Sequence, residues 1–144
     1  MPEITAEDFN TIMEEELPFA HEVGMRAAEI GEGVAVLHMP PNESQLRPGG
    51  TVSGPAMMAL ADAAMYAALL SKIGPVKLAV TTSFNANFLY RPEPVNLIAE
   101  AEIIKLGKRL AVIEVTVRSE GNRRRGPYDG DLFDPAPNLR YGCP

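Results

Sequence analysis

The sequence has few of the residues on which several common kinds of protein site depend. Its 144 residues include one cysteine, Cys143, two histidines and no tryptophan. A lone cysteine excludes an internal disulfide and fits a reducing compartment. His21 and His38 stand apart in the sequence, without the partners and spacing of a metal site. We therefore expect no metal site. The sequence also contains no Gly-rich phosphate loop and no Ser-His-Asp signature.

Basic charge and long apolar runs are scarce as well. Lys and Arg number 13 against 19 Asp and Glu, which gives a net charge of −6. A nucleic-acid-binding protein normally shows a basic field instead. The first residues lack the basic and then apolar run of a signal peptide. The longest apolar run, residues 55–70, contains Asp62 and is shorter than a membrane span. We therefore expect a soluble, cytoplasmic protein that binds neither nucleic acid nor membranes.

The N-terminal part of the chain predicts one helix and two strands. Thr5 resembles an N-cap, and apolar residues then recur at helical spacing, which predicts a short amphipathic helix over residues 5–16. Residues 22–39 suit two strands joined by a turn at residues 31–33. Residues 40–54 are rich in Pro and Gly, which predicts a long irregular loop of the kind that often carries function.

The strongest predicted element is a helix from Pro55 to about Ser71, which ends near Gly74. It is rich in Ala, Met and Leu, and proline stands at a plausible first helical position. Apolar residues occupy every face of this helix, so we expect it to be buried on all sides.

The segments that we expect to cover this helix follow it in the sequence. Residues 80–89, 97–104 and 110–118 alternate in polarity as strands do, and residues 105–109 form a hairpin connection around a glycine. An antiparallel sheet curled around the apolar helix satisfies these patterns. The sequence thus predicts one α+β domain over residues 1–144, with a core at about 20–120 and an atypical tail at 121–144.

Two features of the predicted helix indicate a functional site. Asp62 would be a costly buried carboxylate unless it is paired or lies at a cavity, which indicates a site. The structural alternative is that it bonds a neighbouring backbone group or lines a wet dimer seam. Gly54 precedes Pro55 at the helix start, where free backbone N–H groups suit an oxygen that gains charge, although this tripeptide also suits a simple cap. Gly54 and Asp62 are roughly 12 Å apart along a helix. If both act on one carbonyl, the second must come from a partner subunit.

The stretch GGTVSGPAMMALADAAMYAALL, followed by AVTTSFNANFLYRP, resembles the motif region of the hotdog-fold acyl-CoA thioesterases of the PaaI type. The resemblance implies a hotdog fold, a coenzyme A thioester as substrate and no separate cofactor. It implies that Asp62 is the general base or nucleophile, and that Gly54 polarises the thioester carbonyl from the neighbouring subunit. Thr81 and Thr82 fall where the family places polar residues near the attacking water.

The sequence departs from that family pattern at two positions. Ser53 stands where the family has histidine, and Pro55 where it has a second glycine, which bears on rate and substrate choice more than on reaction class. Serine can still donate or accept a hydrogen bond. Both residues remain candidates for substrate binding, together with Met58, which suits either a core or a pliable acyl pocket.

The predicted hairpin carries Lys105, Lys108 and Arg109, which could meet the phosphates of coenzyme A or form a solvated tip. A homodimer or a tetramer of two dimers is expected. A dehydratase of the same fold is disfavoured because neither histidine lies near the central helix. A non-catalytic acyl-binding protein is the alternative, although a binding site would gain by replacing Asp62 with an apolar residue.

The tail after Glu120 has no strand alternation, whereas the resemblance calls for one more strand there. One permitted choice of codons for residues 125–136, read without its first base, encodes Val-Ala-His-Met-Thr-Val-Thr-Tyr-Ser-Ile-Pro, which matches that strand closely. We therefore predict that a frameshift, in the gene or its recorded sequence, replaced the final strand. An unshifted tail would be mostly irregular and would leave the strand at 110–118 without its partner. Clear side chains for residues 123–143 as written, together with a matching intact mass, would show that the protein carries this tail.

Overall fold

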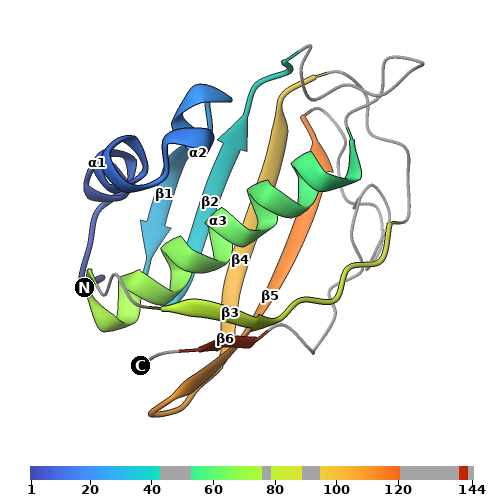
Figure 1. The fold of residues 1–144 in the computed structure, drawn as a ribbon. Coiled ribbons are helices and arrows are strands. Elements are labelled where there is room, and N and C mark those ends of the chain that lie inside the picture. The colour runs from blue at the N-terminus through green and yellow to red at the C-terminus, as the bar shows by residue number, and fades with distance from the viewer. Residues whose placement is uncertain (43–52, 76–78, 89–94, 121–139, 143–144) are drawn as a thin grey trace.

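The computed structural model describes residues 1–42, 53–75, 79–88, 95–120 and the backbone of 140–142. Helices α1 (Ala6–Glu16) and α2 (Pro18–Glu22) precede strands β1 (Arg26–Gly31) and β2 (Val34–Met39). The long helix α3 (Gly54–Ile73) follows, and then strands β3 (Val80–Ser83), β4 (Leu97–Leu106), β5 (Leu110–Ser119) and β6 (Arg140–Gly142). Figure 1 shows α3 lying across one face of the sheet. The predicted antiparallel sheet around a central helix is thus confirmed.

Helix α1 begins with reciprocal capping hydrogen bonds, as its sequence predicts. The Asp8 N–H donates to Thr5 Oγ1 at 3.1 Å, and the Thr5 N–H donates to Asp8 Oδ2 at 2.8 Å. The Thr5 backbone and hydroxyl both stabilise the ionised form of Asp8, which lowers its pKa. Phe9 and Met13 are the buried residues of this helix. Because these residues belong to the hydrophobic core, the core begins earlier than the predicted position of about residue 20.

The sheet has six strands in the order β1-β2-β4-β5-β6-β3, and every neighbouring pair is antiparallel. Small and aliphatic side chains alternate into its inner face, where α3 packs. Ala35, Ala99 and Ala101 are buried there, and their small size lets the helix approach the sheet closely.

The helix α3 is longer than predicted and forms the centre of the core. It has 20 residues, and by length and composition alone it could cross a membrane. The expectation that this run is too short for a membrane span is therefore wrong, because the helix extends beyond residues 55–70 at both ends. Some 67% of its most apolar stretch is buried inside the fold. Most of this stretch is therefore packed inside the fold, as in a core helix.

One side of α3 remains uncovered in the single chain, so the expectation of burial on all sides is only partly correct. Pro55 and Met58 are exposed along this side, while Ala59, Asp62 and Tyr66 are half-buried. The remaining sides of the helix meet the sheet or the N-terminal helices.

Two predicted elements differ from the structure. Short helix α2 was not predicted, and it displaces the start of the first strand from residue 22 to Arg26. The strand predicted at 80–89 ends at Ser83, although residue 89 lies outside the described part of the chain. Strand β3 ends at Ser83 because it pairs with β6, which has three residues. The hydrogen-bonded ladder between the two strands therefore ends at Ser83.

Strand β6 also bears on the predicted tail. Its three residues pair with Leu110–Val112 of β5 and with β3, so this part of the tail does join the sheet. Within the described residues, no strand pairs with the outer edge of β5 from Ile113 onward. The frameshift and the irregular tail predicted for 121–139 and 143–144 concern residues that lie outside the described part.

The buried hydroxyl of Ser71 joins α3 to the β1–β2 turn. Its Oγ accepts a hydrogen bond from the Gly33 N–H at 2.8 Å and donates to the Ala68 carbonyl at 2.6 Å. We expect Ser71→Ala to lower the free energy of unfolding by about 1–3 kcal/mol, because it leaves the buried Gly33 N–H without this acceptor. Chemical denaturation measures the loss. The exposed Thr11→Ala should change stability by less than about 0.5 kcal/mol, and equal effects of the two variants would contradict this role.

Candidate functional site

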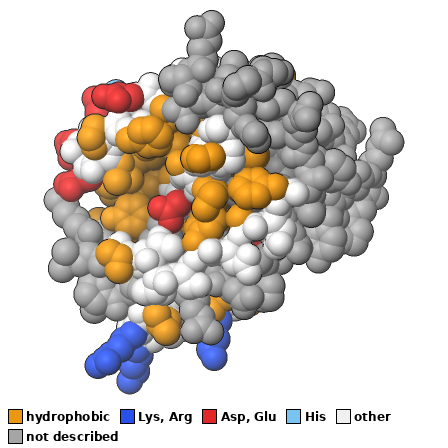
Figure 2. Space-filling model, turned by 45° about the vertical axis from the view of Figure 1, so that its right-hand side comes forward, with side chains coloured by type: hydrophobic (Ala, Val, Ile, Leu, Met, Phe, Trp, Pro, Cys, Tyr) orange, Lys and Arg blue, Asp and Glu red, His pale blue; other side chains and the backbone are white. Residues whose placement is uncertain are grey.

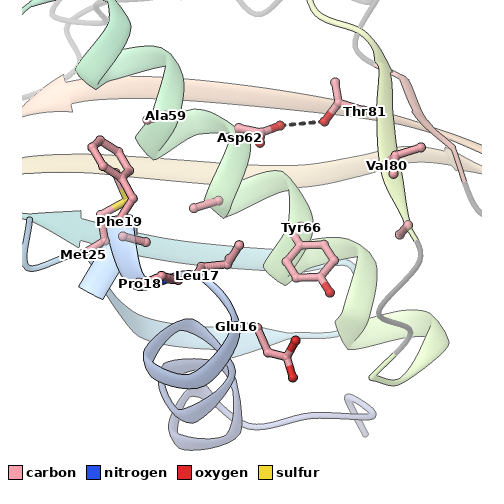
Figure 3. A pocket seen from close by; sticks show the side chains of 13 residues that line it. Glu16, Leu17, Pro18, Phe19, Met25, Ala59, Asp62, Tyr66, Val80 and Thr81 are labelled. Atoms are coloured by element: carbon pink, nitrogen blue, oxygen red, sulfur yellow. Dashed lines mark hydrogen bonds between the residues drawn. The ribbon is translucent and has the colours of Figure 1, made fainter. Parts of the chain in front are cut away.

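A cavity of about 550 Å³ lies beside the uncovered side of α3. Four parts of the chain enclose it: the corner between α1 and α2, Met25 just before β1, the middle of α3, and the start of β3 (Figure 3). Most of its surface is apolar. The residues that line it are Glu16, Leu17, Pro18, Phe19, Ala20, Met25, Ala59, Asp62, Ala63, Tyr66, Ala79, Val80 and Thr81. Apolar cavities with a few convergent polar groups are the usual form of small-molecule sites.

Asp62 brings a carboxylate into this apolar surrounding. It is the one acidic residue of α3, and it stays half-buried at the cavity wall. Thr81 Oγ1 donates a hydrogen bond to Asp62 Oδ1 at 2.7 Å, which joins the central helix to strand β3 (Figure 3). Figure 2 shows an acidic side chain within the apolar hollow of this face. The charge is thus held at a cavity instead of being buried in the core, which avoids most of its desolvation cost.

The side chains around Asp62 follow from helical geometry. Ala59, Asp62, Ala63 and Tyr66 line the cavity together because positions three, four and seven residues apart share one face of a helix. The two alanines leave space next to the carboxylate. Sequence reasoning missed Ala59, Ala63 and Tyr66 as lining residues, although their spacing from Asp62 is a signal that could have found them.

The opposite wall comes from the N-terminal helices. Leu17 and Phe19, which are 37% and 53% exposed, line the cavity from this side with large apolar side chains. Sequence reasoning missed them because helix α2, which carries Phe19, was not predicted. No local signal marks these residues, since their role depends on how the N-terminal helices pack beside α3.

The N-terminus of α3 has a distinct set of hydrogen bonds. Ser53 is the N-cap, and its Oγ accepts a hydrogen bond from the Ala56 N–H at 3.3 Å. Its carbonyl accepts from the Met57 N–H at 3.2 Å. Pro55 has no N–H to donate. Within the described residues, the Gly54 N–H therefore remains as the donor without a partner in the first turn.

The structure brings some of the predicted site residues together and keeps others apart. Asp62 and Thr81 are in direct contact, and Thr82 follows on the exposed strand β3. Met58 is 38% exposed and does not line the cavity. Ser53, Gly54 and Pro55 lie at the start of α3, about two helical turns before Asp62. Lys108 and Arg109 are exposed at the β4–β5 hairpin and do not line the cavity either.

The two histidines lie away from this cavity, in keeping with their isolation in the sequence. His21 is exposed on α2, and His38 Nδ1 lies 3.1 Å from Asn96 Nδ2. Among the residues that the structure describes, no three His, Cys, Asp or Glu side chains are grouped as metal ligands.

Comparison with known proteins gives one family. The family model described as "Thioesterase superfamily" matches residues 49–125, which include the start of α3, Asp62 and Thr81. No curated protein matches the sequence significantly.

Similar solved structures share the whole fold. A structure from Silicibacter sp. TM1040, assigned provisionally as a thioesterase, is 30% identical with a TM-score of 0.82, and covers 100% of this chain and 94% of that chain. A variant of the phenylacetic acid degradation protein PaaI from Thermus thermophilus is 27% identical with a TM-score of 0.67, over 87% and 95%. A thioesterase from Haemophilus influenzae is 22% identical with a TM-score of 0.76, over 96% and 87%, which shows the fold alone. The predicted hotdog fold is therefore confirmed.

Proposed function

The chain belongs to the thioesterase superfamily, and on that premise we propose that it hydrolyses acyl-CoA thioesters in the cavity beside Asp62. Membership of the family indicates thioester hydrolysis in general. The observation that carries the finer proposal is Asp62 itself, the one carboxylate on a helix that is otherwise a core element, held by Thr81 at an apolar cavity. Such an acid suits reaction chemistry better than packing.

In the proposed reaction, Asp62 either removes a proton from an attacking water or attacks the thioester carbonyl itself. In the first route, water oxygen bonds to the carbonyl carbon, Asp62 takes the water proton, the carbon–sulfur bond breaks, and the thiolate of coenzyme A leaves and receives a proton. In the second, an oxygen of Asp62 bonds to the carbonyl carbon, the carbon–sulfur bond breaks and the thiolate leaves, and water then hydrolyses the resulting anhydride, which releases the acid, restores Asp62 and supplies a proton to the thiolate. The 2.7 Å bond from Thr81 fixes one carboxylate oxygen for either route, so Thr81 is a positioning residue.

The developing oxyanion needs a donor, and the Gly54 N–H is suited to this role. It stands at a helix N-terminus, where the helix dipole favours negative charge. Ser53 already satisfies the Ala56 N–H, which leaves the Gly54 N–H as the open donor within the described residues. Eight residues of helix separate Gly54 from Asp62, roughly 12 Å along the axis. We therefore propose that each site combines Asp62 of one subunit with Gly54 of the other.

Several exposed groups support a dimer at this face. All four residues of β3 are exposed, and β3 is the last strand in the order of the sheet. Met58, Val80 and Phe88 are 38%, 61% and 49% exposed in the single chain. A second copy would remove this apolar surface from water and could pair with the sheet edge. The proposed assembly is a homodimer or a pair of dimers.

The proposed substrate needs no separate cofactor, since coenzyme A is its own leaving group. Lys108 and Arg109 remain proposed contacts for the phosphates of coenzyme A. Figure 2 shows basic side chains below the apolar hollow, at the end of the molecule where the β4–β5 hairpin lies. A non-catalytic acyl-binding protein is the second candidate, favoured by Ser53 and Pro55 in place of the family's histidine and glycine.

We expect Asp62→Asn to lower kcat by about 100-fold or more, because the amide keeps an acceptor for Thr81 but cannot take the proton or attack. Steady-state turnover of a panel of short, long and aromatic acyl-CoA thioesters measures the loss. Glu102→Gln, which makes the same chemical change at an exposed position of β4, is the control and should leave kcat unchanged. Near-normal turnover by a folded Asp62→Asn would show that Asp62 is structural.

Mixed dimers test whether each site spans two subunits. Gly54→Pro removes the N–H and adds a pyrrolidine ring. Proline is accepted in the first helical turn, and Ser53 already has the extended backbone (φ −69°, ψ 152°) that a residue before proline adopts. Gly54→Ala keeps the N–H, and its methyl would lie 3.5 Å from Phe88, an ordinary contact. We expect Gly54→Pro to lose activity and Gly54→Ala to retain it.

Co-expression of Gly54→Pro with Asp62→Asn should then restore activity. In a mixed dimer, one site receives Asp62 from one subunit and Gly54 from the other, so random pairing recovers roughly a quarter of the wild-type rate per subunit. Each variant alone remains inactive. If the mixture is as inactive as the separate variants while size measurements show mixed dimers, the site does not combine these two residues across subunits.

A further inference from the structure

Tyr66 is the largest side chain that α3 contributes to the cavity, and the proposed reaction gives it no role. We propose that Tyr66 limits the length of the acyl group that this protein accepts. This inference rests on the proposed function in one respect, that the acyl group of the thioester occupies the cavity beside Asp62.

The position of Tyr66 relative to Asp62 defines a short channel along the helix. Tyr66 lies four residues after Asp62, on the same face and about 6 Å further along the helix axis. Between them the helix presents Ala63, whose methyl group leaves space over the helix surface. An acyl chain that extends from a carbonyl at Asp62 in this direction passes Ala63 and meets the Tyr66 ring within about one helical turn.

The ring of Tyr66 is held in place from behind. Its centroid lies 5.8 Å from that of Phe9, with the rings tilted by 60°, an arrangement in which aromatic pairs attract each other. Phe9 is 0% exposed on α1, so the ring cannot move in that direction without disturbing the core. In Figure 3 the hydroxyl of Tyr66 points away from Asp62, so the ring edge faces the carboxylate. Tyr66 is therefore a fixed and largely apolar end wall.

A fixed wall discriminates by size, because a chain longer than the channel must leave methylene groups in water or displace the core. Burial of each further methylene is expected to favour binding by roughly fourfold where space exists. Removal of the wall should therefore raise activity on long acyl chains and change activity on short ones little. The ratio of the two activities reports this effect and is independent of the fraction of enzyme that is folded.

The experiment measures kcat/KM for butyryl-CoA and dodecanoyl-CoA in the wild type and three variants. Tyr66→Ala removes the wall, Tyr66→Leu shortens it but retains apolar packing on Phe9, and Tyr66→Phe keeps the ring. We expect the dodecanoyl-to-butyryl ratio to rise by about tenfold or more in Tyr66→Ala and, to a lesser degree, in Tyr66→Leu. Tyr66→Phe should retain the wild-type ratio. Tyr66→Leu keeps the test valid if Tyr66→Ala does not fold.

Calorimetric binding of S-butyl-CoA and S-dodecyl-CoA, thioethers that cannot be hydrolysed, separates the length limit from the proposed reaction. If the wild type hydrolyses neither these two thioesters nor the aromatic acyl-CoA thioesters of the panel, while the Tyr66→Ala and Tyr66→Leu variants still gain affinity for the dodecyl thioether, hydrolysis is refuted and the length limit is supported. The length limit is overturned if Tyr66→Ala and Tyr66→Leu are active but keep wild-type selectivity. In that case their dodecanoyl-to-butyryl ratios of kcat/KM, and their dodecyl-to-butyl ratios of affinity, stay within about twofold of the wild-type ratios.

Discussion

The burial of α3 is the constraint on which the rest of this structure depends. Leu60, Met65, Leu69 and Leu70 are each 0% exposed, and burial of such side chains contributes about 1.5–3 kcal/mol apiece. A helix with apolar residues on most of its sides needs cover on most of its sides. The curved antiparallel sheet supplies most of that cover, and the N-terminal helices supply more through Phe9 and its neighbours. The order of strands, the small residues on the inner sheet face and the position of α1 all serve this packing.

The same constraint explains where the site lies. Only the side of α3 that the sheet and α1 do not cover can carry a carboxylate without a large desolvation cost. Asp62 occupies that side, and its neighbours at helical spacing line the cavity by necessity. Thr81 reaches Asp62 because β3 runs past the same uncovered side. The proposed reactive group and the proposed acyl pocket thus lie at one gap in the cover of the central helix, where the proposed partner subunit would also bind.

Much of this arrangement was predictable from local pattern, and the exceptions share a physical cause. The helix at 5–16, the buried helix and the β4–β5 hairpin follow from capping, periodicity and turn residues within short segments. Helix α2 has five residues and no such periodicity, so Phe19 could not be placed at the cavity in advance. Strand β3 stops at Ser83 because its partner β6 has three residues, a fact about pairing that alternation cannot reveal. Tyr66 was open to prediction from its spacing and was missed.

The two departures from the family motif, Ser53 and Pro55, act on the same few backbone donors. A helix begins with N–H groups that lack partners within the helix. Proline at 55 removes one of them, and the Ser53 hydroxyl satisfies that of Ala56. Within the described residues this leaves Gly54 as the open donor, at the end of the helix where the dipole is positive. The two residues therefore reduce the open N–H donors at the start of α3 to one, that of Gly54, within the described residues. Because one donor remains, the departures are consistent with a change in substrate preference rather than in the kind of reaction.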